Sequence, residues 1–178
     1  MKEKVTLSNG SLQLIIAVTG YEFSKMSDPN DANWLLVEVD LIVGEKRFCN
    51  TWPALETGDL DRISHWFDDL GHARLPSVIR LGFLEPNLEF QVFRATDEFV
   101  RIGVHLSHES KPPFRTLPLI PDPEEQSAIC IFELTYAELL NISVTFQQIS
   151  EQFPKREFIS STDTVSQHFL KMQSSRFS

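Results

Sequence analysis

The sequence predicts an α+β fold, in which an antiparallel, twisted β-sheet, in one layer or two, is packed by two α-helices. Residues 33–43 alternate between apolar and more polar side chains, as a strand with one buried face does. Shorter alternating segments follow one another across tight turns, which is typical of an antiparallel meander. Residues 58–70 and 136–153 carry apolar side chains at helical spacing. The patterns leave open whether the strands form one sheet, a sandwich or a half-closed barrel.

The size and composition of the chain fit one acidic domain. It has 178 residues, 42% of them hydrophobic, which is enough for a single core without cross-links. We expect the domain to span residues 1–153, followed by a polar extension, 154–178, that is a short helix or disordered. The net charge of −11 on residues 1–153 disfavours nucleic acid and anionic membranes as partners and favours a basic protein. Two widely separated cysteines, with no apolar leader and no membrane-length apolar run, predict a cytoplasmic protein.

Hairpins are expected in the first third of the chain. Residues 4–18 should form one or two short strands with an Asn-Gly turn, because glycine accepts the left-handed dihedrals of a tight hairpin. A polar connection over residues 20–32 leads to the main strand. That strand returns through Gly44 into a second one, 46–52, which Pro53 ends because proline cannot donate a backbone hydrogen bond.

The first helix is predicted to begin with Thr57 as its N-cap and to end at Gly71. Its apolar face comprises Leu60, Ile63, Phe67 and Leu70. Residues 56–69 hold five acidic side chains and one basic one, so this helix should present negative charge.

Further strands and a second helix complete the predicted domain. Strands are expected at 78–83, 88–94, 99–106 and 126–134. Five prolines between residues 111 and 125 exclude a helix or a central strand, so we expect a long extended loop over one sheet edge. The second helix opens with a capping box of Thr135 and Glu138, and Pro154 stops it. Its apolar stripe comprises Leu139, Ile142, Phe146, Ile149 and Phe153.

No catalytic or metal-binding motif stands out. The histidines nearest in sequence are His65 with His72 and His105 with His108. Neither spacing makes a chelate unaided. Cys49 and Cys130 lie among apolar strand residues, so we expect buried, unreactive thiols. Residues 28–33 offer several oxygen atoms but lack the glycine and glutamate of an EF-hand, which favours a turn. We therefore predict no metal, no cofactor and no enzymatic activity.

Several stretches of the sequence resemble a known family. Residues 31–35, DANWL, follow Tyr21-Glu22-Phe23 and enter the main strand. They are followed by Trp52, the segment 55–57, the Trp66-Phe67 pair of the acidic helix, and the Glu-Pro-Asn-Leu turn within residues 83–90. In these features, over roughly residues 10–153, the chain resembles the WapI-like (wall-associated-protein) immunity family. Phe67 stands where the family has leucine.

The resemblance implies a bacterial immunity protein that binds the toxic domain of a cognate toxin and blocks it. A nuclease toxin would suit the acidic body, because its cleft must be basic to hold phosphates. On this hypothesis the acids of the first helix form the first candidate contact surface, and the turn at residues 28–31 the second. The candidate partner-binding residues are Asp28, Asp31, Asp59, Asp61, Asp68 and Asp69.

Two other functions stay open. The chain could be a small-molecule-binding or enzymatic domain that uses a cleft between sheet and helices. It could instead be an adaptor whose sheet edge or proline-rich loop receives a partner strand. Copurification of a metabolite would favour the first, and a stable complex with a non-toxic endogenous protein would favour the second.

Overall fold

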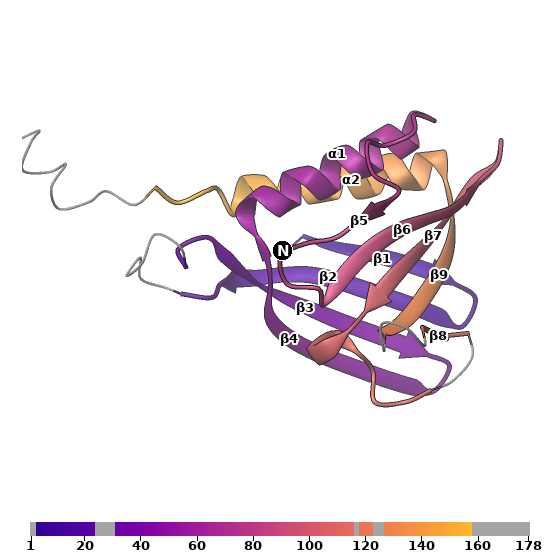
Figure 1. Cartoon of the computed structure of the whole chain (residues 1–178), viewed down its shortest axis with the longest axis horizontal. Coiled ribbons are helices and arrows are strands. Elements are labelled where there is room, and N and C mark those ends of the chain that lie inside the picture. The colour runs from indigo at the N-terminus through magenta and orange to yellow at the C-terminus, as the bar shows by residue number, and fades with distance from the viewer. Residues whose placement is uncertain (1–2, 24–30, 116–117, 123–126, 158–178) are drawn as a thin grey trace, which may run out of the picture.

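The computed structural model describes residues 3–23, 31–115, 118–122 and 127–157, and it confirms the α+β prediction (Figure 1). The described strands form two antiparallel sheets, ordered β1-β2-β3-β4 and β5-β6-β7-β9-β8. The first sheet contains β1 (Lys4–Asn9), β2 (Leu12–Tyr21), β3 (Trp34–Val43) and β4 (Lys46–Glu56). The second contains β5 (Arg80–Leu81), β6 (Leu88–Ala95), β7 (Phe99–Leu106), β8 (Ile120–Asp122) and β9 (Ser127–Thr135). The helices among the described residues are α1 (Thr57–Gly71), the short 3₁₀ helix η1 (His108–Ser110) and α2 (Tyr136–Gln152).

The alternating sequence of β3 becomes an alternation of burial. Every second residue from Leu35 to Leu41 is 0% exposed, because it faces the core. Gly10 (φ +59°) and Gly44 (φ +60°) supply the left-handed turns of the two hairpins. Strand β2 runs on to Tyr21 across a register shift, so the expected polar connection begins later than residue 20.

Strand β4 continues to Glu56, so the expected strand end at Pro53 is wrong. Pro53 pairs with Leu36 beyond a register shift, and β4 is the outer strand of its sheet, where a missing N–H breaks no ladder. The strand runs directly into α1, whose N-cap is Glu56 rather than the expected Thr57. The backbone N–H of Glu56 donates to the Asp59 carboxylate at 2.9 Å.

The second sheet differs from expectation at both of its edges. Strand β5 covers only Arg80–Leu81 rather than residues 78–83, and Val78 instead accepts a 2.8 Å hydrogen bond from Trp66 Nε1 of α1. The proline-rich segment, expected to be loop throughout, contributes β8, which pairs with β9. Because β8 is an outer strand, it can contain a proline.

Helices α1 and α2 lie side by side along the sheets (Figure 1) and meet through small residues. Ser64 Oγ donates to the Ser143 carbonyl at 3.0 Å, and Ser143 Oγ donates to the Ser64 carbonyl at 2.9 Å, both buried. A Cβ added to Gly71 would lie 2.6 Å from Leu140 Cδ2. Helix α1 ends at Gly71 as predicted, but the left-handed residue that follows it is Ala73 (φ 55°), and Gly71 serves the helix contact.

One continuous core joins the sheets to the helices. Phe67 of α1, Phe90 of β6 and Phe146 of α2 are each 0% exposed. The Phe67 ring meets Phe90 edge-on at 5.4 Å between centroids and stacks on Phe146 at 6.1 Å. The apolar faces predicted for both helices are buried as expected, and Phe153, beyond the end of α2, is partly buried.

The cysteine predictions hold for one residue of two. Cys130 is buried, whereas Cys49 is exposed, because it pairs with Asp40 on the outer face of the edge strand β4. Burial raises the pKa of Cys130 to about 12. Desolvation, then the charge of Glu38, raises the pKa of Cys49. Both thiols therefore stay protonated at neutral pH, the form that is a poor nucleophile.

The outer face of the first sheet carries an ion pair that links stability to pH. Arg47 Nε and Nη2 donate to the two carboxylate oxygens of Asp40 at 2.8 and 2.7 Å, and Asp40 is 7% exposed. These hydrogen bonds hold the pKa of Asp40 below its usual value. Asp40 therefore stabilises the fold above the ordinary carboxyl pKa, and that stabilisation is lost as the pH falls through the lowered pKa.

We expect Asp40→Asn to be less stable than the wild type near neutral pH, with the difference shrinking below about pH 4. Urea unfolding of both proteins across this range measures the difference. Glu133→Gln is the matched control, because the ion pair of Glu133 with Arg101 is about 42% exposed at Glu133 and should contribute little. A difference for Asp40→Asn that stays constant through acid pH would contradict the linkage.

Candidate functional site

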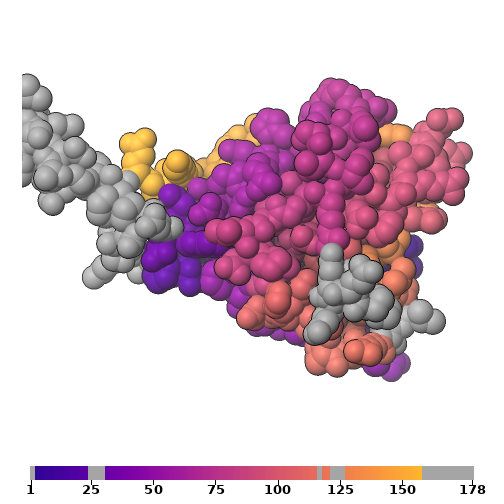
Figure 2. Space-filling view, in the orientation of Figure 1, coloured from indigo at the N-terminus to yellow at the C-terminus, as the bar shows by residue number. Residues whose placement is uncertain are grey.

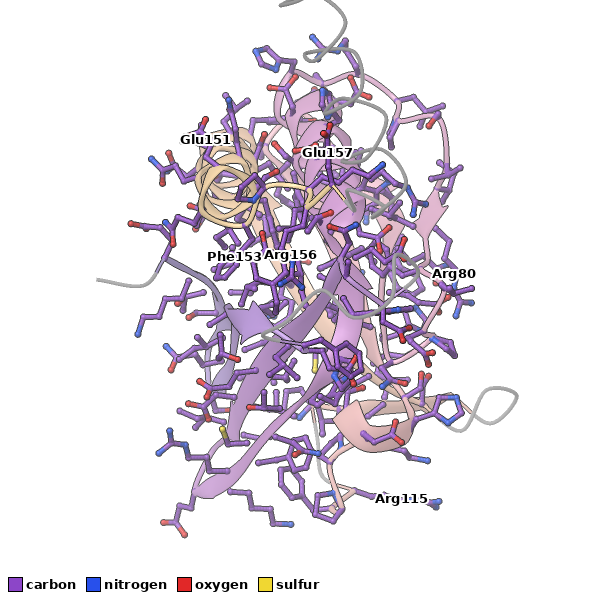
Figure 3. The ribbon with its side chains drawn as sticks, turned by 90° about the vertical axis from the view of Figure 1, so that its left-hand side faces the viewer. Arg80, Arg115, Glu151, Phe153, Arg156 and Glu157 are labelled. Carbon is purple, nitrogen blue, oxygen red and sulfur yellow. The ribbon has the colours of Figure 1, made fainter. Side chains whose placement is uncertain are left out.

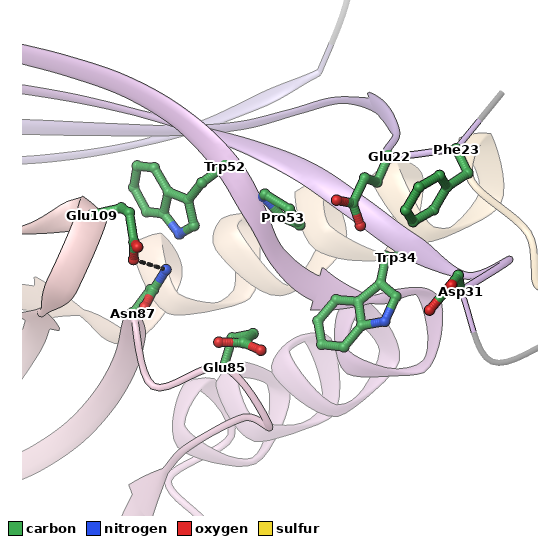
Figure 4. A pocket seen from close by; sticks show the side chains of 9 residues that line it. All are labelled: Glu22, Phe23, Asp31, Trp34, Trp52, Pro53, Glu85, Asn87 and Glu109. Carbon is green, nitrogen blue, oxygen red and sulfur yellow. Dashed lines mark hydrogen bonds between the residues drawn. The ribbon is translucent and has the colours of Figure 1, made fainter.

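A groove of about 490 Å³ opens where β2, β3 and β4 approach the segment that precedes β6 (Figure 4). On the face shown in Figure 2, the violet surface of the β2–β3 end lies close to the pink surface of that segment. Five separate stretches of the chain line the groove: Glu22 and Phe23, Asp31 and Trp34, Trp52 and Pro53, Glu85 and Asn87, and Glu109.

One wall of the groove is aromatic. Trp34, the first residue of β3, is half-buried, and its ring faces the groove (Figure 4). Trp52 and Pro53 come from β4, and the register shift between these two strands lies beside them. Pro53, where the sequence predicted that the strand would end, therefore lies within β4 and forms part of this wall.

The opposite wall is polar and held by hydrogen bonds. Asn87, 4% exposed, donates from Nδ2 to Glu109 Oε2 at 3.0 Å. Asn50 of β4 donates to the Glu109 carbonyl at 2.9 Å, which ties η1 to the first sheet. Ser110 Oγ donates to the Ser107 carbonyl at 2.6 Å and also contacts the Asn87 carbonyl. These bonds fix the Glu109 carboxylate at the rim of the groove.

The residues that line the groove carry negative charge. Glu22, Asp31, Glu85 and Glu109 line it, and none of the other described lining residues is basic. Burial, and then repulsion from the charge of Asp31, raises the pKa of Glu22 above its ordinary value. A bound cation would relieve this repulsion.

A buried hydrogen-bond donor is left unused at the same place. Trp52 is only 5% exposed, and its Nε1 has no hydrogen-bond partner in the described part of the chain. Figure 4 shows the indole nitrogen directed into the groove. An unsatisfied buried N–H costs about 1–3 kcal/mol, so this atom is suited to an acceptor supplied by a ligand.

The chain beyond α2 braces the end of β2 and the start of β3. Arg156 Nε donates to the Ala32 carbonyl at 2.7 Å and Nη2 donates to the Phe23 carbonyl at 3.0 Å. The Arg156 guanidinium lies 3.8 Å from the centroid of the Tyr21 ring. Figure 3 shows Arg156 beside Phe153, just after α2. These contacts hold the strand ends that carry Glu22 and Asp31; residues 158–178 of the expected extension lie outside the described residues.

The candidate partner-binding residues occupy different environments. Asp31 lines the groove, and Asp28 lies outside the described residues. Asp59 is 8% exposed and is held by the cap of α1 and by Arg62 Nη1 at 2.7 Å. Asp61 accepts a 2.6 Å hydrogen bond from Ser150 Oγ of α2 but remains exposed.

The two acids at the end of α1 share one basic partner. Arg74 Nη2 lies 2.7 Å from Asp68, and Arg74 Nε lies 2.9 Å from Asp69. His72 Nδ1 lies 3.3 Å from Asp68. The negative charge of the helix end is thus offset within the chain, which also relieves its unfavourable position relative to the helix dipole.

Sequence reasoning did not assign Glu22, Trp52, Glu85 or Glu109 to a site. They lie far apart in the chain, and no local spacing links them. The signal that could have found them is the family resemblance, because seven of the nine lining residues lie in the stretches that carry it. The stretches at 21–23, 31–35, 52 and 83–90 contribute these residues, whereas those at 55–57 and 66–67 do not line the groove.

Two further observations concern metal binding and membrane insertion. Within the described ranges, no group of three or more histidine, cysteine, aspartate or glutamate side chains is placed to hold a metal ion. None of the helices among the same residues is both long enough and apolar enough to cross a membrane.

Comparison with known proteins identifies one family. The model of the "Immunity protein WapI-like family" matches residues 5–154. No curated protein matches the chain. Among solved structures, "Structure of the plant transcriptional regulator PBF-2" is similar, with a TM-score of 0.47 and 10% sequence identity over 86% of this chain and 82% of that one.

Proposed function

The chain belongs to the WapI-like immunity protein family, and from this we propose that it binds the toxic domain of a cognate bacterial toxin and neutralises it. The match over residues 5–154 is the observation that carries the proposal, since it spans both sheets and both helices. We propose that inhibition occurs by binding alone, in the cytoplasm, with no cofactor and no reaction catalysed by this chain.

The negative net charge of the domain favours a basic protein as its partner. Residues 1–153 carry a net charge of −11, and a toxin that cleaves nucleic acid needs a basic cleft to hold phosphates. Charge complementarity of this kind accelerates association and excludes wrong partners. We therefore propose a nuclease as the toxin class, contacted through acidic surface.

The experiment is a pull-down from the native host, with the purified full chain as bait, at low and at moderate salt. We expect recovery of a basic toxin domain whose binding weakens as salt rises. Copurification of a small metabolite without a protein would instead favour a ligand-binding or enzymatic domain. A stable complex with a non-toxic protein would favour an adaptor.

The acids of α1 that remain at least partly exposed, Asp61, Asp68 and Asp69, are proposed as part of the contact surface. Reversing the charge of Asp61, Asp68 and Asp69 to lysine should slow association with the recovered toxin by about tenfold at low salt. Asp59 is left unchanged because it caps the helix. Surface plasmon resonance at two salt concentrations measures the rate. Association that is as fast as that of the wild type would remove this face of α1 from the interface.

A further inference from the structure

The side chains that line the groove limit the kinds of ligand that it can bind. Its carboxylates are spread over separate segments and, in the described residues, do not form a cluster that could hold a metal ion. A ligand that satisfies them must therefore carry an extended positive charge with several donors. The guanidinium of arginine has five N–H donors in a planar fork and also stacks on aromatic rings.

The aromatic wall adds a second requirement. The half-buried ring of Trp34 offers a face for a cation, and cation–π attraction is strongest for tryptophan. Trp52 Nε1, in contrast, needs an acceptor, which a guanidinium cannot supply. A peptide supplies both at once, because its backbone carbonyl accepts a hydrogen bond while its arginine side chain donates.

We propose that the groove receives an arginine side chain and an adjoining peptide carbonyl from a basic segment of the toxin. The guanidinium lies between the Trp34 ring and the carboxylates of Glu22 and Glu85, and the carbonyl accepts from Trp52 Nε1. The inference rests on the proposed function for the identity of the partner. The chemistry of the groove does not depend on that identity, so the two can be tested separately.

The test uses the ¹⁵N-labelled full chain and a capped glycyl-arginyl-glycine peptide as the probe. A short peptide binds weakly, so it is titrated to about 10 mM while the indole N–H resonance of Trp52 is followed. We expect a saturable shift of that resonance, since an acceptor arrives at the indole. The same peptide with citrulline in place of arginine keeps the shape but lacks the charge, and it should bind at least about tenfold more weakly.

Two double variants with the same change in net charge, one in the groove and one outside it, test whether the peptide binds in the groove. Glu22→Gln with Glu85→Gln should lower peptide affinity at least about tenfold, because both carboxylates lose their charge. Asp97→Asn with Glu98→Gln is the matched control, since these exposed acids lie on the β6–β7 turn, at the far end of the molecule from the β2–β3 end (Figure 1). The carboxylates of Glu22 and Glu85 make no hydrogen bond or ion pair with other described residues, so both variants should fold like the wild type.

Each outcome decides the proposal. The proposal is supported if the Trp52 indole resonance shifts with the arginine peptide, but only weakly with the citrulline peptide or in Glu22→Gln with Glu85→Gln. No shift, an equal shift with citrulline, or an equal effect of the control variant overturns it. If the pull-down yields a toxin that Glu22→Gln with Glu85→Gln binds as tightly as the wild type, the groove proposal fails and toxin neutralisation stands. If the arginine peptide binds but the pull-down recovers no toxin, the groove is an arginine-binding site and the proposal of toxin neutralisation is wrong.

Discussion

Replacing Phe67 by alanine is expected to lower the free energy of unfolding by about 3–5 kcal/mol. Phe67 is 0% exposed, and its ring contacts aromatic partners from both helices and the second sheet: Trp66 in α1, Phe146 in α2 and Phe90 in β6. Truncation leaves a cavity that none of these rigid rings can fill. Since domains of this size are stable by about 5–15 kcal/mol, the loss is a large fraction of the total.

Urea unfolding followed by circular dichroism measures this loss. Phe93→Ala is the control with the same atoms removed, because Phe93 is 47% exposed on the second sheet, and it should cost at most about 1 kcal/mol. Comparable losses for the two variants would show that the aromatic cluster does not hold the helices to the sheet.

Substitution of Gly71 by alanine is expected to destabilise the protein by about 1–3 kcal/mol, even though alanine is the better helix former. The new Cβ would lie 2.6 Å from Leu140 Cδ2 and 3.1 Å from the Leu140 backbone nitrogen. The side chain can rotate away, but the backbone contact can be relieved only by moving α1 and α2 apart. That movement would strain the reciprocal hydrogen bonds of Ser64 and Ser143.

A second glycine of α1 provides a control, because its replacement by alanine should stabilise the protein. Gly58 lies in the first turn of α1 and is exposed, and a Cβ added there would meet no other atom within 4 Å. Gly58→Ala should therefore stabilise the protein by up to about 1 kcal/mol. A double-mutant cycle of Gly71→Ala with Leu140→Ala should show partial compensation, because truncation of Leu140 removes the side-chain contact and leaves the backbone contact. Strictly additive effects would mean that the Leu140 side chain does not contribute to the cost.

The elements with strong local signals could be predicted from the sequence. The alternation from Leu35 to Leu41 and the Thr135–Glu138 capping box both depend on residues within one element, and the structure shows both as expected. Errors arose where position in the sheet overrides local preference. Pro53 is tolerated and Cys49 is exposed because β4 is an outer strand, and strand order is not visible in a local pattern.

The groove could not be predicted for a related reason. Glu22, Trp52 and Glu109 lie far apart in the sequence, and they line one groove because the strands pair and Asn50 ties η1 to β4. Acid density in the sequence points to α1 instead, but it cannot reveal which carboxylates are offset by Arg62 and Arg74. Which carboxylates have a basic partner is determined only by the folded structure.

The outer strand β4 also determines how a partner can attach. Its middle is already bonded through Asn50 to the Glu109 carbonyl, and Pro53 offers no N–H to an incoming strand. At its other end, Lys46 and Arg47 are exposed charges of the kind that disfavour edge-to-edge pairing. This edge therefore resists extension of the sheet by a foreign strand, and it equally protects the folded protein from aggregating through strand addition. Recognition at this end of the molecule is left to side chains, whose identities can change without altering the sheet that carries them.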